Sequence, residues 1–156
     1  MSSPPPSRGS TATRWTGIGA THIDHIVISS NNSEVVAETF RRNLGIEIRR
    51  TMSRPGTGAR LAFAKLGDVI LEFAGPPEPD PAAEVKARLW GMVLAVADIA
   101  AAVERLRGLG YDVTDPRPAV QPGALIATVK SGTGGVPFAL IQYNAIPHES
   151  PAGAAP

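Results

Sequence analysis

The sequence predicts an α+β fold assembled from two copies of one β-α-β-β-β unit. Two strand-like runs, 24–28 and 90–94, are each followed by a helical pattern that ends at a Leu-Gly pair. Three further strand-like runs with turn residues between them follow each helix. The copies stay in step: Gly45 and Gly110 are 65 positions apart, and His25 and Gly91 are 66 apart.

The two helices are predicted from apolar residues that recur with helical spacing. In the first helix these are Val36, Phe40 and Leu44, and in the second they are Ile99, Val103 and Leu106. The second helix has Asp98 as its N-cap. Gly45 and Gly110 suit the left-handed conformation at a helix C-terminus.

The remaining strands are predicted between turn residues rich in glycine and proline. In the first copy the runs are 46–52, 61–66 and 69–74, and in the second copy they are 111–114, 125–130 and 136–143. A linker over 76–87 joins the copies, and Asp80-Pro81 predicts a short helix within it.

The composition excludes several classes of protein. The chain has 156 residues, of which 43% are hydrophobic and 19% are charged, with a net charge of +1. Such a balance fits a globular domain and argues against a disordered chain or a nucleic-acid partner. Cysteine is absent, so disulfides, thiolate nucleophiles and cysteine-ligated metals are excluded.

Both ends of the chain are poor in apolar residues and rich in Pro, Ser, Gly and Ala. We expect flexible tails over 1–22 and 147–156 around a single folded domain, 23–146, with modules 23–75 and 88–146. No apolar run reaches the roughly 18 to 20 residues that a membrane span needs, so we expect a soluble, cytoplasmic protein with no membrane partner.

Strand parity places His25 and Glu72 on the same kind of face, which mixes small and polar residues and suits the wall of a cavity. A carboxylate beside an imidazole can raise its basicity, which prepares a general base. The alternatives are a core histidine bonded to backbone and a carboxylate that faces water or pairs with an arginine.

The chain resembles the vicinal oxygen chelate superfamily, the glyoxalase/bleomycin-resistance/dioxygenase group. The resemblance is carried by the runs 23–28, 69–73 and 90–98 and by the helix-ending Leu44-Gly45. It implies that each module curls into half of an open barrel and that the two half-barrels enclose a cleft. It also implies a small-molecule ligand and a possible homodimer.

The resemblance further implies four inward positions that usually hold a divalent metal. His25 and Glu72 occupy two of them, whereas Gly91 and Ala139 stand at the other two. A catalytic metal normally needs about three protein ligands. We therefore expect no cofactor. The alternative is a divalent metal on His25 and Glu72, with Tyr143, water or substrate completing its shell.

Gly91 and Ala139 in place of ligand-sized side chains predict empty space for a larger or more apolar ligand. The alternative is that Trp15, Trp90 or Tyr143 fills the gap. We count Gly91, Ala139 and Tyr143 as candidate ligand-binding residues.

Arg60, at the start of the third strand, is the fourth candidate for ligand binding. Its guanidinium could reach a carboxylate on a ligand in the cleft, or it could form an ion pair with Glu72.

These residues and the resemblance predict a small enzyme that acts by acid-base proton transfer. Its substrate is a compact, oxygen-bearing, partly apolar molecule, and the reaction is of isomerase, epimerase or lyase type. His25 acts as base or acid, and Glu72 is its partner. One alternative is a non-catalytic protein that sequesters a small molecule or drug, and another is a metal-dependent glyoxalase- or dioxygenase-like enzyme with an incomplete ligand set.

Overall fold

The computed structural model describes residues 17–144, which form one eight-stranded sheet with two helices on it. The first module holds β1 (Ala20–Ser30), α1 (Ser33–Leu44), β2 (Ile48–Ser53), β3 (Arg60–Leu66) and β4 (Val69–Gly75). The second holds β5 (Ala87–Val96), α2 (Ile99–Gly108), β6 (Arg117–Pro118), β7 (Ala124–Val129) and β8 (Phe138–Tyr143). The predicted α+β fold of two βαβββ modules is confirmed.

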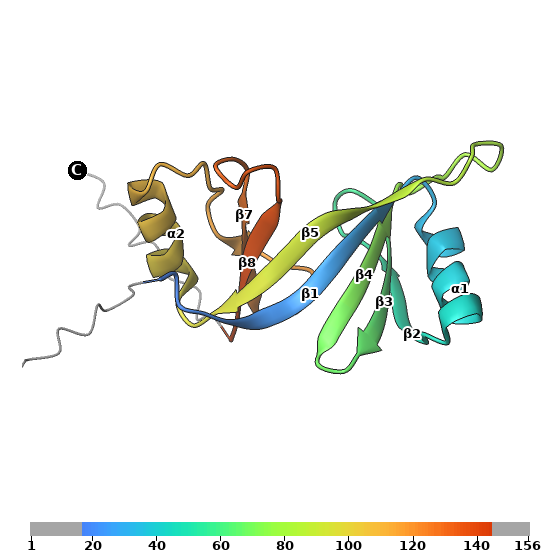
Figure 1. Cartoon of the computed structure of the whole chain (residues 1–156), viewed down its shortest axis with the longest axis horizontal. Coiled ribbons are helices and arrows are strands. Elements are labelled where there is room, and N and C mark those ends of the chain that lie inside the picture. The colour runs from blue at the N-terminus through green and yellow to red at the C-terminus, as the bar shows by residue number, and fades with distance from the viewer. Residues whose placement is uncertain (1–16, 145–156) are drawn as a thin grey trace, which may run out of the picture.

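The strand order, β2-β3-β4-β1-β5-β8-β7-β6, shows how the modules join. Within each module the first and last strands are parallel neighbours, β1 with β4 and β5 with β8. The long strands β1 and β5 pair antiparallel and run through the middle of the molecule, with α1 and α2 toward opposite ends (Figure 1). The two modules are therefore joined by the β1–β5 ladder.

Each helix begins at a side-chain cap and covers the sheet of its own module. The side chains of Asn32 and Asp98 accept hydrogen bonds from the backbone N–H groups of Val35 and Ala101. Gly45, at φ 68°, ends α1 in the left-handed region. Leu44 differs from its predicted core role because it is 62% exposed, at the last turn of α1.

The core consists of one apolar cluster beneath each helix. Under α1, the fully buried Phe73 meets Phe40 edge-to-face, with ring centroids 5.0 Å apart. Under α2, Leu140 and Ala127 are fully buried. Each cluster takes alternate residues of the strands, which leaves the other face of the sheet for the remaining side chains.

The other face of the second module also carries an apolar cluster. Its buried members are Val93, Ala95, Ala124, Ala139 and Ile141, and Val27, Trp90, Ala119 and Ile126 pack against them. The side chains that parity assigned to a cavity wall are therefore packed against one another in this module.

Three boundaries differ from the prediction. The predicted strand 111–114 is reduced to an isolated bridge between Val113 and Val129, and the short strand β6 follows it at Arg117–Pro118. The first strand begins at Ala20 because Ala20 and His22 already pair with β5, so part of the predicted tail is strand. The linker has no helix at Asp80-Pro81: the Asp80 carboxylate accepts a bond from the Ala82 N–H at 2.8 Å, but a turn replaces the helix in this exposed segment. Residues 1–16 and 147–156 of the predicted tails lie outside the described residues. Neither described helix is long and apolar enough to cross a membrane.

Candidate active site

A line of five polar side chains crosses the sheet where the two modules meet. The Tyr143 hydroxyl donates to Asp24 Oδ2 at 3.0 Å, and the same oxygen lies 2.7 Å from His25 Nδ1. On the other side of the ring, His25 Nε2 lies 3.4 Å from Glu72 Oε2, and Arg54 Nη2 donates to Glu72 Oε1 at 3.0 Å. We call Tyr143, Asp24, His25, Glu72 and Arg54 the polar chain.

A bulge in β1 explains how two consecutive residues of one strand can touch through their side chains. Ile23 pairs with Leu94 and His25 pairs with Val93, so Asp24 is an extra residue on β1. An extra residue breaks the alternation of side chains between the two faces of a strand. Asp24 and His25 therefore share one side of β1, although neighbouring strand residues ordinarily point apart.

The middle of the polar chain is shielded from water and its two ends are not. Asp24, His25 and Glu72 are 8%, 3% and 4% exposed, whereas Tyr143 is 40% exposed and the Arg54 side chain 38%. Buried ionisable groups are stable only where protein partners replace water. In the polar chain, each buried side chain has its neighbours in the chain as these partners.

The protons on the Tyr143 side of the ring have defined positions. Burial raises the pKa of Asp24, but hydrogen bonds with His25 and Tyr143 outweigh it and leave this pKa below its ordinary value. Burial and the bond to Asp24 raise the pKa of Tyr143 above its ordinary value. At neutral pH Asp24 is thus an ionised acceptor, so Tyr143 and His25 Nδ1–H both donate to it. The remaining ring nitrogen, Nε2, faces Glu72.

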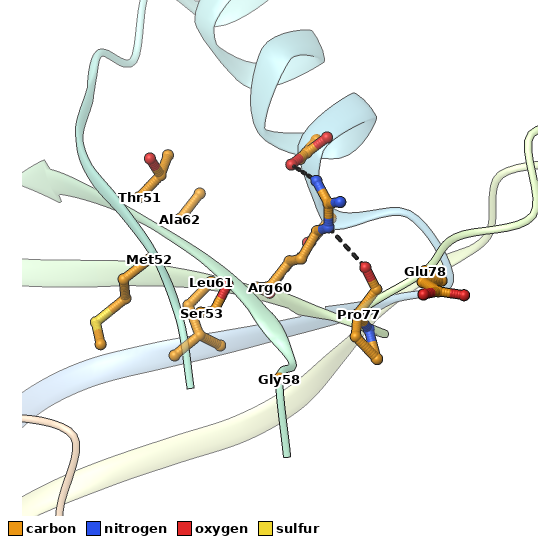
Figure 2. Close-up of a pocket in the computed structure, with 11 residues that line it drawn as sticks. Thr51, Met52, Ser53, Gly58, Arg60, Leu61, Ala62, Pro77 and Glu78 are labelled. Atoms are coloured by element: carbon orange, nitrogen blue, oxygen red, sulfur yellow. Dashed lines mark hydrogen bonds and ion pairs between the residues drawn. The ribbon is translucent and has the colours of Figure 1, made fainter. Parts of the chain in front are cut away.

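Arg60 does not reach this site. It is paired with Gly75 in the β3–β4 register, and since Phe63 is paired with Glu72, Arg60 falls on the opposite face of the sheet. There its guanidinium bonds Glu34 and the backbone oxygen of Pro77 (Figure 2). The sequence-based assignment of Arg60 to the cleft is therefore wrong, and Arg54 forms the ion pair with Glu72.

A surface pocket of about 470 Å³ lies beside Arg60, between the start of α1 and the strands β2 and β3 (Figure 2). Its lining includes Ser33, Glu34, Thr51 and Glu78, and none of the polar chain. The pocket is thus separate from the candidate active site.

Comparison with known families agrees with this architecture. The family model of the Glyoxalase/Bleomycin resistance protein/Dioxygenase superfamily matches residues 24–128, two thirds of the chain. The chain belongs to this superfamily. No curated protein matches it.

Solved structures of the same fold include several methylmalonyl-CoA epimerases. The Mycobacterium tuberculosis enzyme is 19% identical, with a TM-score of 0.67 over 82% of this chain and 91% of that chain. A variant of the Streptomyces coelicolor enzyme in complex with 2-nitronate-propionyl-CoA is 25% identical, with a TM-score of 0.67 over 81% and 96%. A methylmalonyl-CoA epimerase in complex with methylmalonyl-CoA and NH4+ is 23% identical, with the same TM-score and coverage.

The residues at the superfamily's four inward positions do not fit a divalent metal. Only His25 and Glu72 offer donor atoms, and the Arg54 guanidinium already sits on the Glu72 carboxylate at 3.0 Å. Asp24 lies against Nδ1, on the other side of the imidazole ring from Glu72, so the three groups do not converge on one point. Within residues 17–144, no other group of His, Asp and Glu side chains provides three ligands.

The space predicted beside Gly91 does not exist. A Cβ atom on Gly91 would lie 2.0 Å from the backbone oxygen of Pro137, which also accepts a bond from the Met92 N–H at 3.4 Å. Ala139 is 1% exposed, inside the apolar cluster of the second module. Gly91 is needed because the parallel pairing of β5 with β8 brings this backbone close, and in the part of the chain that the structure describes this backbone fills the space beside Gly91.

Sequence reasoning missed two members of the polar chain. Asp24 was hidden by the bulge, because strict alternation places it opposite His25. The alternation along β2 could have identified Arg54. Arg50 and Met52 pair with Phe63 and Leu61 on the Glu72 face, and Arg54 continues their period of two.

Substitution of Gly91 by alanine tests the close approach of β8. We expect the free energy of unfolding to fall by about 1–3 kcal/mol, the usual cost of overpacking, because the added methyl group meets backbone that must shift. Urea unfolding measures this loss. Gly108→Ala is the matched control: it adds the same group at the end of α2, where nothing lies within 4 Å, and we expect no loss of stability. Equal effects of the two substitutions would contradict the packing.

Substitution of Tyr143 by phenylalanine tests the hydrogen bond to Asp24. We expect a loss of about 1 kcal/mol at pH 7, below the usual range for a bond to a charged group because Tyr143 is 40% exposed. The lowered pKa of Asp24 means that its ionised form stabilises the fold above the ordinary value of 3.8, and this stability is lost as the pH falls through the lower folded value. The loss caused by Tyr143→Phe should therefore shrink in acid.

Unfolding curves recorded at pH 7 and at steps below pH 4 would show this convergence of the two proteins. Tyr111→Phe is the control, because the Tyr111 ring packs against the core under α2, away from Asp24. A Tyr143→Phe deficit that stays constant through the acid range would rule out an ionised Asp24 as the acceptor.

Proposed function

We propose that this chain is an enzyme that moves a proton to and from a carbon next to a carbonyl group, in a reaction of isomerase, epimerase or lyase type. The observation that carries the proposal is the pairing of His25 Nε2 with Glu72 Oε2 at 3.4 Å, while Asp24 holds Nδ1 at 2.7 Å. The superfamily contributes the fold and leaves the chemistry to these residues.

The arrangement equips His25 and Glu72 as an acid-base pair. Asp24 fixes Nδ1 as the protonated nitrogen of neutral His25, so Nε2 has a lone pair for a proton, and the same carboxylate stabilises the imidazolium that forms. One member of the pair takes the proton from the carbon, and the C–H electrons move onto the carbonyl oxygen as an enolate. Return of a proton to the carbon regenerates the carbonyl group, and return to the opposite face inverts the configuration of that carbon.

The substrate we propose is a compact, oxygen-bearing, partly apolar acyl compound. Apolar residues continue from His25 toward the second module, with Val27 beside Gly91 in the β1–β5 ladder and Val93 beside Ala139 in the β5–β8 ladder. Methylmalonyl-CoA is the first compound to test, because it is the ligand of a solved structure with this fold. Its C2 proton lies between two carbonyl groups and is acidic for a carbon acid.

Binding without turnover is the second candidate, and the burial of the pair favours it. His25 and Glu72 are only 3% and 4% exposed, so a ligand must displace part of the fold to touch them. A sequestering protein would hold its ligand in proportion to its own concentration, whereas an enzyme would convert an excess.

Exchange of substrate protons with D2O tests the catalytic role directly. Proton NMR of methylmalonyl-CoA in D2O should show faster loss of the C2 proton with catalytic amounts of protein. We expect His25→Ala and Glu72→Gln each to lower the rate at least about a hundred-fold, as expected for removal of a general acid or base. His22→Ala is the matched control, because His22 is an exposed histidine of the same strand.

Thermal unfolding of each variant would show that its fold is intact. His25→Gln provides a second variant that keeps a polar group in place of the ring. Exchange that survives the loss of His25 would remove this residue from the mechanism. A protein that binds methylmalonyl-CoA in a fixed ratio and exchanges no proton would instead be a sequestering protein.

A further inference from the structure

Arg54 stands at the half-exposed end of the polar chain, next to the buried carboxylate of Glu72. It follows β2, and the turn after it is closed by bonds of its own backbone with Ala59 (2.8 Å) and Gly58 (2.9 Å). Its guanidinium is thus presented from a defined turn, with one nitrogen on Glu72 at 3.0 Å. The side chain is 38% exposed, so part of it meets solvent.

The Arg54 guanidinium has an unused donor. Its Nε is covered from solvent and bonds no partner within residues 17–144. A buried donor of a charged group without an acceptor is costly, and such groups in native proteins usually have a reason. Nε and a neighbouring Nη form a fork of N–H groups that donates two hydrogen bonds to the two oxygens of a carboxylate. Here the fork contacts a single carboxylate oxygen, Glu72 Oε1.

The charges along the polar chain favour entry of an anion from this end. The other exposed end, Tyr143, leads to the ionised carboxylate of Asp24, which repels an anion. Arg54 offers a permanent positive charge beside the Glu72–His25 pair. Of the two ends of the polar chain, only the Arg54 end therefore offers a carboxylate-bearing ligand a charge of opposite sign.

We propose that Arg54 is the recognition site for a carboxylate group of the ligand, a small carbonyl compound with one free carboxylate. Because Nε is covered in the structure, the guanidinium turns away from Glu72 Oε1 as the ligand binds, and Nε and Nη2 then donate to the ligand's two carboxylate oxygens. Glu72 then stands free beside His25 Nε2. This second consequence, the release of Glu72 by the bound carboxylate, rests on the proposed function. Arg54 itself binds and positions the ligand.

A pair of probes, one with a free carboxylate and one with that carboxylate esterified, tests the site. Monoethyl methylmalonate has one free carboxylate, and diethyl methylmalonate is its neutral counterpart. Titrations followed by NMR should show the wild-type protein binding the monoester at least about ten-fold more tightly than the diester, as one charged hydrogen-bonded contact requires. Arg54→Gln should abolish this preference.

Three further variants keep the test independent of folding. Arg54→Lys keeps the charge opposite Glu72 but lacks the fork, and it should retain only part of the preference. The double variant Arg54→Gln/Glu72→Gln leaves no unpaired carboxylate in the interior and should show no preference. Arg60→Gln is the matched control: it is an arginine paired with Glu34 on the other face of the sheet, and its removal should leave the preference unchanged.

Deuterium exchange recorded in the same samples separates this inference from the proposed function. Charge-selective binding that depends on Arg54, without proton exchange, would uphold the carboxylate site and overturn the proposed catalysis. Proton exchange with no preference for the monoester, or a preference that survives in Arg54→Gln, would overturn the carboxylate site alone. Failure of the wild-type protein to bind the monoester at millimolar concentrations would also overturn it.

Discussion

The contact between Asp24 and His25 organises the centre of this molecule. It depends on one extra residue in β1, and it lies on the strand that joins the two modules. Through it, Tyr143 of the second module connects with Glu72 and Arg54 of the first. Each buried carboxylate of the polar chain has protein partners, since Asp24 faces the Tyr143 hydroxyl and His25 Nδ1 and Glu72 faces the Arg54 guanidinium, which makes the burial of these groups tolerable. The fold and the proposed chemistry thus share one set of interactions.

The two modules differ around the polar chain. The first supplies His25, Glu72 and Arg54, whereas the corresponding face of the second is filled by the cluster around Val93, Ala139 and Ile141. Gly91 and Ala139 do not open a void, because the Pro137 backbone occupies the space beside Gly91. In place of a metal, the Glu72 carboxylate has the guanidinium of Arg54 as its positive partner. This asymmetry concentrates the reactive groups in one module and the apolar packing in the other.

Periodicity predicted the fold well because strands, helices and their caps are local features. The repeat, the helix ends at Gly45 and Gly110, and the shared face of His25 and Glu72 all follow from spacing along the chain. The bulge at Asp24 does not, since it depends on the pairing of β1 with β5. Nor does the close approach of Pro137 to Gly91, which needs the parallel register of β8. Arg60 was assigned to the wrong face because β3 places Leu61 and Phe63, and not Arg60, on the face of Glu72. Arg54 follows Arg50 and Met52 at intervals of two and falls on the Glu72 face.

The position of the proton on the His25 ring tests the central claim most directly. Nitrogen-15 NMR of histidine-labelled protein distinguishes the two ring nitrogens, and His22→Gln and His148→Gln assign the signals of the chain's three histidines. The structure predicts that Nδ1 of His25 carries a proton in a strong hydrogen bond, and that Asp24→Asn, which replaces the ionised acceptor, weakens that bond and shifts the signal. A neutral His25 ring protonated only at Nε2, with a signal indifferent to Asp24→Asn, would contradict the account.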